Sequence, residues 1–145
     1  MRVDLEIVGQ LIKPKSRILD LGCGEGDLLH FAKMKKQATG FGLDNDPNNI
    51  QTCLEKGVNV IEQDLDSGLT NFDDNSFDLV IMTETLQAVS KPEQLMKEML
   101  RVGKECIVTI PNFGQIFCRL NLFFSGKMPV AVSYTHLTLP TIYSV

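Results

Sequence analysis

The sequence predicts an α/β protein with a mostly parallel sheet and a nucleotide-type site at the carboxyl edge of that sheet. The first observation is a short apolar run over 18–21 that stops at the glycine-rich turn Gly22-Cys23-Gly24-Glu25-Gly26. The second is that apolar, strand-like runs alternate with helical patterns, which favours right-handed βαβ crossovers. The third is that acidic residues follow the second and third of these runs, and such sheets bind ligands beside the carboxyl ends of their strands.

The first half of the chain predicts an N-terminal helix followed by two strand–helix units. Apolar residues lie at helical spacing from Leu5 to Ile12, and Pro14 ends that helix. Asp46-Pro47 is a good helix start, with an acidic N-cap and proline at the first helical position, and Gly57 suits the left-handed residue beyond its end. The expected elements are strands over 17–21, 39–43 and 58–61, a helix over 27–36 and a helix between Asp46 and Gly57.

The second half predicts two more strands and one helix. The run 77–82 is almost continuously apolar, as expected for a strand that is covered on both faces. Ser90 with Glu93 three residues later resembles a capping box, and Gly103 ends the helix that follows. A last apolar run over 105–110 predicts the fifth strand.

Composition and charge exclude several classes of protein. The 145 residues suit one domain, and the formal net charge of −4 argues against a nucleic-acid partner bound through a broad basic face. No apolar run reaches the ~18 residues that a membrane span needs, and acids stand where a signal peptide would carry its apolar core. We therefore expect a cytoplasmic protein with neither a nucleic acid nor a membrane as a partner.

The cysteines and histidines predict neither a metal site nor a disulfide framework. The four cysteines share no CxxC spacing, and each lies in or beside an apolar segment. The two histidines, His30 and His136, show no paired-ligand spacing. We expect reduced, packed cysteines and no bound metal.

The glycine turn and three acidic positions form a candidate nucleoside site. The turn glycines adopt backbone conformations that other residues resist and let a ligand approach the chain closely. Asp44, 22 residues after Gly22, can accept both ribose hydroxyls, while Asp64 and Leu65 can take the exocyclic amine and the face of an adenine. Asp20 can orient the amides of the turn or meet a cationic group of the ligand.

Each of these features also has an ordinary interpretation. A glycine turn alone serves close helix–strand packing in many α/β proteins, and a single acid is more often a helix cap or a solvated loop residue. Their joint occurrence after three successive strands favours nucleoside binding.

Together these residues resemble class I S-adenosylmethionine-dependent methyltransferases, over about residues 10–111. The resemblance implies a Rossmann-like sheet in the strand order 3-2-1-4-5, with helices on both faces, and S-adenosylmethionine as the cofactor. It also implies that the turn glycines line the methionine part of the cofactor, that Asp44 holds the ribose and that Asp64 with Leu65 holds the adenine. The motifs that carry the resemblance are 18–26, Gly42-Leu43-Asp44, Gln63-Asp64-Leu65 and 77–80. The complete candidate cofactor-binding set is Asp20, Gly22, Cys23, Gly24, Gly26, Asp44, Asn45, Asp64, Leu65 and Thr83.

Within that superfamily the chain resembles the MetW family of methionine-biosynthesis proteins, from its start to about residue 130. The runs that carry this closer resemblance are 57–61, 75–78, 82–89, 98–103 and 105–114. MetW-like proteins are associated with the acylation of homoserine, which implies a homoserine O-acyltransferase as the partner. Two functions stay open: a partner subunit that binds S-adenosylmethionine and supports the acyltransferase, and an S-adenosylmethionine-dependent methyltransferase acting on an unknown small molecule.

No catalytic residue for methyl transfer is evident. Many small-molecule methyltransferases carry a histidine soon after the fourth strand, where this chain has Leu86-Gln87, and glutamine accepts no proton at neutral pH. Glu84 is the only acid nearby, and its ordinary interpretation as a solvated or capping residue is favoured. The glutamine slightly favours the partner-subunit function.

The end of the chain resembles something other than natural protein. Residues 132–141 are similar to the translation of a transposon-end adapter used in preparing sequencing libraries. The alternative is a natural, β-prone tail of threonines and leucines. We expect a methyltransferase-like domain over 1–130 and a non-native tail over 131–145. The fold would then be truncated before its last two strands, with strand five at the sheet edge and a helix over 120–124.

Overall fold

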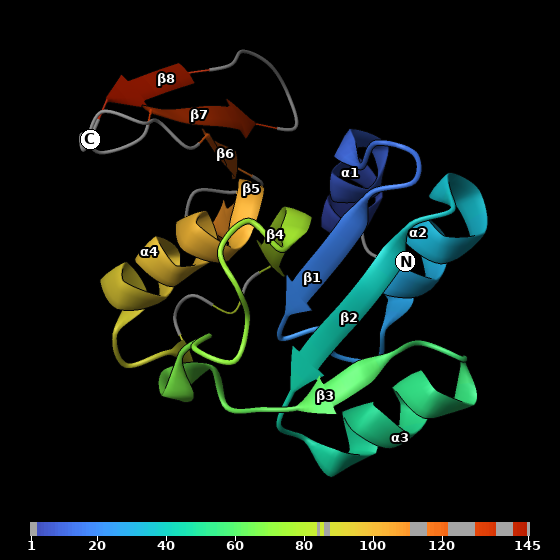
Figure 1. Cartoon of the computed structure of the whole chain (residues 1–145). Helices are drawn as coiled ribbons and strands as arrows, with labels where there is room; N and C mark the ends of the chain where they lie inside the picture. Colours follow the sequence, from blue (N-terminus) through green and yellow to red (C-terminus); the bar gives the residue numbers. More distant parts are fainter. Residues whose placement is uncertain are drawn as a thin grey trace.

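The computed structural model describes residues 3–83, 85, 88–110, 116–121, 130–135 and 141–144. In these ranges the chain forms one eight-stranded sheet with helices packed on it (Figure 1). The helices are α1 (Val3–Leu11), α2 (Asp27–Lys36), α3 (Pro47–Glu55), the 3-10 helix η1 (Leu65–Ser67) and α4 (Pro92–Val102). The strands are β1 (Arg17–Leu21), β2 (Thr39–Asp44), β3 (Val60–Glu62), β4 (Phe77–Thr83), β5 (Gly103–Ile110), β6 (Ile116–Asn121), β7 (Val130–Thr135) and β8 (Thr141–Ser144).

The first five strands are parallel and lie in the order β3-β2-β1-β4-β5. This confirms the predicted strand order. β1 and β4 lie in the middle, with Ile18 opposite Leu79 and Leu21 opposite Met82. All their carboxyl ends therefore meet at one edge of the sheet, where the loops that follow them lie together.

Helices cover both faces of this sheet, as predicted. Figure 1 shows α1 and α2 on one side of the strands and α4 on the other. Alternate residues of β4 point into different cores: Ile81 packs with α1 and α2, whereas Met82 packs with α4. Both side chains are fully buried, and this is why the strand reads as a continuous apolar run in the sequence.

The prediction that the fifth strand forms a sheet edge is wrong. β5 pairs along its length with β6, antiparallel, from Glu105 opposite Asn121 to Ile110 opposite Ile116. Unpaired backbone groups at a sheet edge bind whichever extended segment lies near them, and the next extended segment of the chain does so here. β7 and β8 continue the sheet in the same antiparallel sense. The non-native origin of residues 131–145 remains a prediction.

The helix expected over 120–124 is also not formed where the structure can be described. Leu120 and Asn121 belong to β6, and 122–124 lie outside the described residues. The run 116–121 carries isoleucine, phenylalanine and leucine, which suit a strand that pairs with β5.

The helix boundaries confirm one predicted cap and correct another. The Asp46 carboxylate accepts from the Asn48 N–H at 2.9 Å, with proline at the first position of α3, as predicted. The capping box at the start of α4 is wrong: Lys91 is the N-cap, without a side-chain cap bond. The backbone N–H and the hydroxyl of Ser90 donate instead to the Asp66 carboxylate, at 2.7 and 3.2 Å. Hydrogen bonds to a charged acceptor such as the Asp66 carboxylate are stronger than those to a neutral one, and Ser90 forms these bonds instead of capping α4.

None of the helices in the described ranges is both long and apolar enough to span a bilayer.

Candidate functional site

The glycine turn after β1 is held against the end of β2. The N–H groups of Gly22 and Cys23 both donate to the Leu43 carbonyl, at 2.8 and 3.0 Å. Gly22, Gly24 and Gly26 all have φ between 58° and 83°, in the left-handed region that only glycine adopts without strain. Gly26 is also the N-cap of α2. Three glycines therefore let one strand turn sharply into a helix.

A cleft of about 470 Å³ opens beside this turn. A Cβ added to Gly24 would meet no atom within 4 Å, whereas one on Gly22 would lie 2.6 Å from Cγ2 of Thr85. Gly22 is thus needed for packing, while the space in front of Gly24 is open. The residues that line the cleft are Leu5, Asp20, Gly22, Cys23, Gly24, Glu25, Asp27, Leu28, Thr83 and Thr85.

Two buried polar side chains of the predicted set lie at the base of this cleft. Asp20 near the end of β1 is 2% exposed and Thr83 at the end of β4 is 7% exposed. Both line the cleft together with Cys23 and the turn glycines. The carboxyl group of Asp20 therefore lies close to any ligand that enters the cleft.

The Asp44 carboxylate joins the glycine turn to the end of β2. One oxygen accepts from the Gly24 N–H at 2.9 Å, and the other accepts from the Asp46 N–H at 2.9 Å and from the Asn49 amide at 3.4 Å. A carboxylate oxygen has two lone pairs, so the oxygen bonded to Gly24 can accept a further hydrogen bond. Asp44 therefore lies beside the glycine turn, although neither it nor Gly26 is among the residues that line the cleft.

The remaining predicted residues lie at the same sheet edge but beyond the cleft. Asn45 is exposed directly after β2. The exposed Asp64 carboxylate caps η1 by accepting from the Asp66 N–H at 2.9 Å, and Leu65 packs half-buried against the core on the α4 side. The Gln63 N–H donates to the Asp44 carbonyl, which keeps this segment beside the end of β2. The predicted set thus follows the edge from β4 through β1 and β2 to the loop after β3.

Several cleft residues were missed by the sequence analysis. Thr85 donates its hydroxyl to the Leu21 carbonyl at 3.3 Å and closes one side of the turn. Its position just after β4 is the signal that could have found it, because the predicted acids also follow strand ends. Leu5 reaches the cleft from α1, and no local sequence signal marks such a long-range contact.

Lys56 forms hydrogen bonds to the outer side of the turn. Lys56 donates to the Asp27 carboxylate at 2.6 Å and to the Glu25 carbonyl at 3.0 Å. This hydrogen bond lowers the pKa of Asp27 and raises that of Lys56. The segment that follows α3 is thereby tied to the start of α2.

The residues considered for catalysis, Glu84, Leu86 and Gln87, lie outside the described residues. Of the described residues that line the cleft, none is a histidine. In the part of the chain that is described, no three metal-binding side chains come together.

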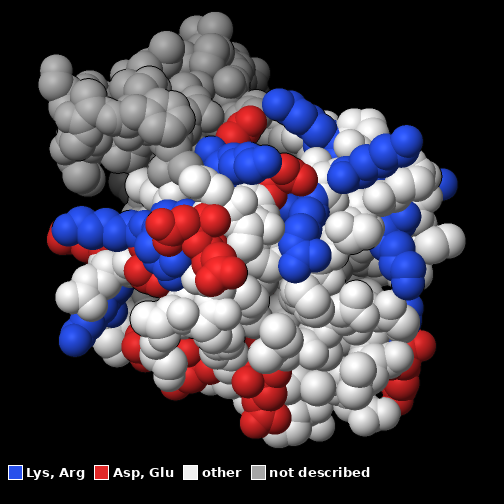
Figure 2. All heavy atoms as spheres, in the orientation of Figure 1, with Lys and Arg blue, Asp and Glu red and all other residues white. Residues whose placement is uncertain are grey.

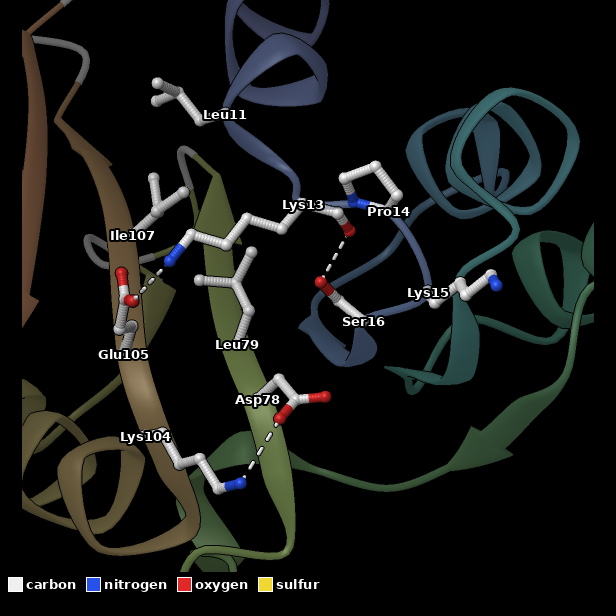
Figure 3. Close-up of a pocket in the computed structure, with 10 residues that line it drawn as sticks. All are labelled: Leu11, Lys13, Pro14, Lys15, Ser16, Asp78, Leu79, Lys104, Glu105 and Ile107. Atoms are coloured by element: carbon white, nitrogen blue, oxygen red, sulfur yellow. Dashed lines mark hydrogen bonds and ion pairs between the residues drawn. The ribbon is translucent and has the colours of Figure 1, made fainter.

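A second cleft, of about 370 Å³, lies at the opposite, amino edge of the sheet. Figure 3 shows two ion pairs in it, Lys13 with Glu105 and Lys104 with Asp78, each at 3.4 Å. On the face seen in Figure 2, basic and acidic side chains lie side by side in the upper part and on the left, and further acidic ones lie at the lower edge. Since α/β sheets bind ligands at their carboxyl ends, the candidate site is the cleft at the glycine turn.

Comparison with known proteins agrees with this fold. The family model described as "Methionine biosynthesis protein MetW" matches residues 2–143. The chain is 36% identical over 139 residues to the bifunctional methionine biosynthesis protein MetXA/MetW of Rhodopirellula baltica, covering 90% of this chain and 22% of that protein. It is 32% identical over 135 residues to the demethylmenaquinone methyltransferase of Staphylococcus epidermidis, covering 82% of this chain and 54% of that one.

A similar fold occurs among solved structures. A SAM-dependent methyltransferase of Thermotoga maritima superposes with a TM-score of 0.60 at 24% identity, covering 74% of this chain and 49% of that one. The chain therefore spans between 22% and 54% of the length of these three proteins. The fold is that of class I S-adenosylmethionine-dependent methyltransferases, and the chain belongs to the MetW family of methionine-biosynthesis proteins.

Proposed function

We propose that this chain binds S-adenosylmethionine in the cleft at the glycine turn and supports a homoserine O-acyltransferase. The observation that carries the first half is the open space in front of Gly24. A side chain there would fill the cleft, yet none of the surrounding atoms requires a glycine for packing. Gly24 faces open space, and hydrogen bonds to Leu43 and Asp44 hold the turn in place. This arrangement suits a cofactor that contacts the backbone of the turn.

The residues present suit the chemical groups of S-adenosylmethionine. Asp44 would accept from the ribose hydroxyls, and the buried Asp20 would provide a negative charge for the cationic part of the cofactor. Asp64 and Leu65, further along the edge, would take the adenine. When bound, the cofactor supplies an electrophilic methyl group. The chain's own contribution is to bind and orient it on a turn that is already rigid.

The proposed support of a homoserine O-acyltransferase rests on the family of the chain and on one relative. That relative's name joins MetXA and MetW in one bifunctional protein, so the two activities occur there in one chain. This chain is similar to 22% of that protein, and we propose a homoserine O-acyltransferase as its partner. A tagged chain mixed with a homoserine O-acyltransferase should retain it on a resin and raise its activity. Absence of both effects, with and without S-adenosylmethionine, would overturn this half.

A small-molecule methyltransferase is the second candidate. The similarity to a demethylmenaquinone methyltransferase favours it, since that relative bears an enzyme's name. Incubating the chain with methyl-labelled S-adenosylmethionine and a panel of small acceptors tests it. Transfer of label that depends on the chain would favour this function over the partner-subunit function.

A further inference from the structure

Two thiols meet behind the glycine turn. The Sγ atoms of Cys23, in the turn, and Cys53, in α3, lie 3.9 Å apart. Both sulfurs also lie against the Gly24 carbonyl, at 3.7 and 3.3 Å. Both cysteines are free thiols in the structure. The pair therefore joins the candidate cofactor turn to a helix that is 30 residues away in the sequence.

The surroundings of the pair are built to hold both sulfurs. A Cβ on Gly42 would lie 2.5 Å from the Cys23 sulfur, and one on Gly26 would lie 2.9 Å from the Cys53 sulfur. Glycines thus leave the room that the thiols occupy. Cys23 is half-buried and lines the cleft, whereas Cys53 is fully buried. A small reagent in the cleft reaches Cys23 first, and Cys53 is placed to react next.

We propose that Cys23 and Cys53 form a reversible disulfide that alters the cofactor turn. The oxidant is a small-molecule disulfide. The Cys23 thiolate attacks one of its sulfurs and expels the first small thiolate; the Cys53 thiolate then attacks the Cys23 sulfur of the mixed disulfide and expels the second. One S–S bond is broken and one is formed. Two electrons pass to the small disulfide, and the two protons of the cysteines end on its two thiols.

The new bond brings the two sulfurs closer together than they now lie. A disulfide holds its sulfurs about 2.05 Å apart, well inside the present separation of 3.9 Å. Cys23 and Gly24 are fixed by hydrogen bonds from their N–H groups to Leu43 and Asp44. Pulling Cys23 toward α3 therefore strains these bonds. If the cofactor binds here as proposed above, the oxidised chain should bind S-adenosylmethionine about tenfold more weakly, within the usual range of coupling between sites.

Burial raises the pKa of the Cys23 thiol, and the nearby Asp20 carboxylate raises it further. Little thiolate is therefore present at neutral pH and exchange is slow. The chain should be brought to equilibrium in buffers of oxidised and reduced glutathione before it is measured.

The experiment combines a peptide map with two readouts. Oxidised protein should yield a proteolytic fragment linking Cys23 to Cys53, and the amides of the turn should exchange hydrogen faster than in the reduced protein. Calorimetry should show the roughly tenfold loss of S-adenosylmethionine affinity. Cys53→Ser, which keeps a donor for the Gly24 carbonyl, should bind like the reduced wild type in both buffers. The matched control Cys118→Ser should respond like the wild type.

The outcomes separate this inference from the proposed function. Absence of the linked fragment at equilibrium overturns the disulfide. A linked fragment with unchanged amide exchange and unchanged affinity overturns its effect on the turn. If even the reduced chain binds no S-adenosylmethionine, the proposed function fails, while the fragment and the amide exchange still decide the inference.

Discussion

At the scale of single residues, the three glycines of the turn have different roles although they look alike in the sequence. Gly22 makes room for Thr85, Gly26 makes room for Cys53 and Val58, and Gly24 alone faces open space. In the sequence these glycines form a single predicted cofactor-binding motif. Packing decides which of them a ligand touches, and packing partners such as Thr85 and Val58 lie far away in the chain.

Gly24→Val should abolish S-adenosylmethionine binding while leaving the fold largely intact. The branched side chain would occupy the open cleft, and its cost to folding is the strain of φ +58°, roughly 1–2 kcal/mol. Calorimetry for binding and a thermal melt for stability check this.

The contrasting variant is Gly40→Ala. Its Cβ would lie 1.8 Å from the Ile18 carbonyl oxygen, so it should unfold the chain or lower its melting temperature strongly. If Gly24→Val binds S-adenosylmethionine like the wild type, the turn serves packing alone.

At the scale of elements, the strand ends and the helix starts were the most predictable features. β1 and α2 have the predicted bounds, because a compact apolar run and a glycine turn fix both within a few residues. β3 begins at Val60 rather than at 58, since the Val58 N–H donates to the Cys53 carbonyl and still belongs to the exit of α3. The start of α4 was mispredicted because its competitor, Asp66, approaches from a distant loop.

Asp27→Asn should weaken the tie between α2 and α3 and lower stability slightly at pH 7. Lys56 lowers the pKa of Asp27 in the folded chain, so the pair stabilises the fold at neutral pH. That contribution declines as the pH falls below the ordinary value of 3.8 and is lost once the lowered pKa is passed. The Asp27 side chain is 47% exposed and screened by solvent, so the effect stays below about 1 kcal/mol.

Urea unfolding of both proteins at several pH values measures this difference. Glu62→Gln, which alters an exposed acid at the end of β3, reports the general effect of removing one negative charge. A stability difference for Asp27→Asn that grows as the pH falls to 3 would contradict the proposed ion pair.

At the scale of the whole molecule, the sequence was sufficient for the parallel half of the sheet and insufficient for the rest. Alternating strands and helices specify β1 to β5 through local patterns and right-handed crossovers. β6, β7 and β8 pair antiparallel, and which extended segments meet is set by the free edge of β5 rather than by a local signal. The cleft was predicted through its strand-end residues, while its wall from α1 was not.

Deleting residues 131–145 should change the melting temperature by less than about 4 °C, the shift that corresponds to about 1 kcal/mol in a chain of this size. The reason is the predicted non-native origin of this segment, since nothing would have selected it to pack against the core. Differential scanning calorimetry of the full and shortened chains checks this. A fall of many degrees would show that β7 and β8 stabilise the domain and that the tail is part of the fold.

The central claim is a cofactor site at the glycine turn, and titration calorimetry with S-adenosylmethionine tests it most directly. The reduced chain should bind one molecule, and Asp44→Ala should bind it more weakly by about 1–3 kcal/mol, through loss of charge-assisted hydrogen bonds. Asp44→Asn, which keeps an acceptor for the Gly24 N–H, separates the ribose contact from support of the turn. Asp46→Ala should lose a helix cap but keep the wild-type affinity. No binding by the wild type, or equal affinity in wild type and Asp44→Ala, would contradict the claim.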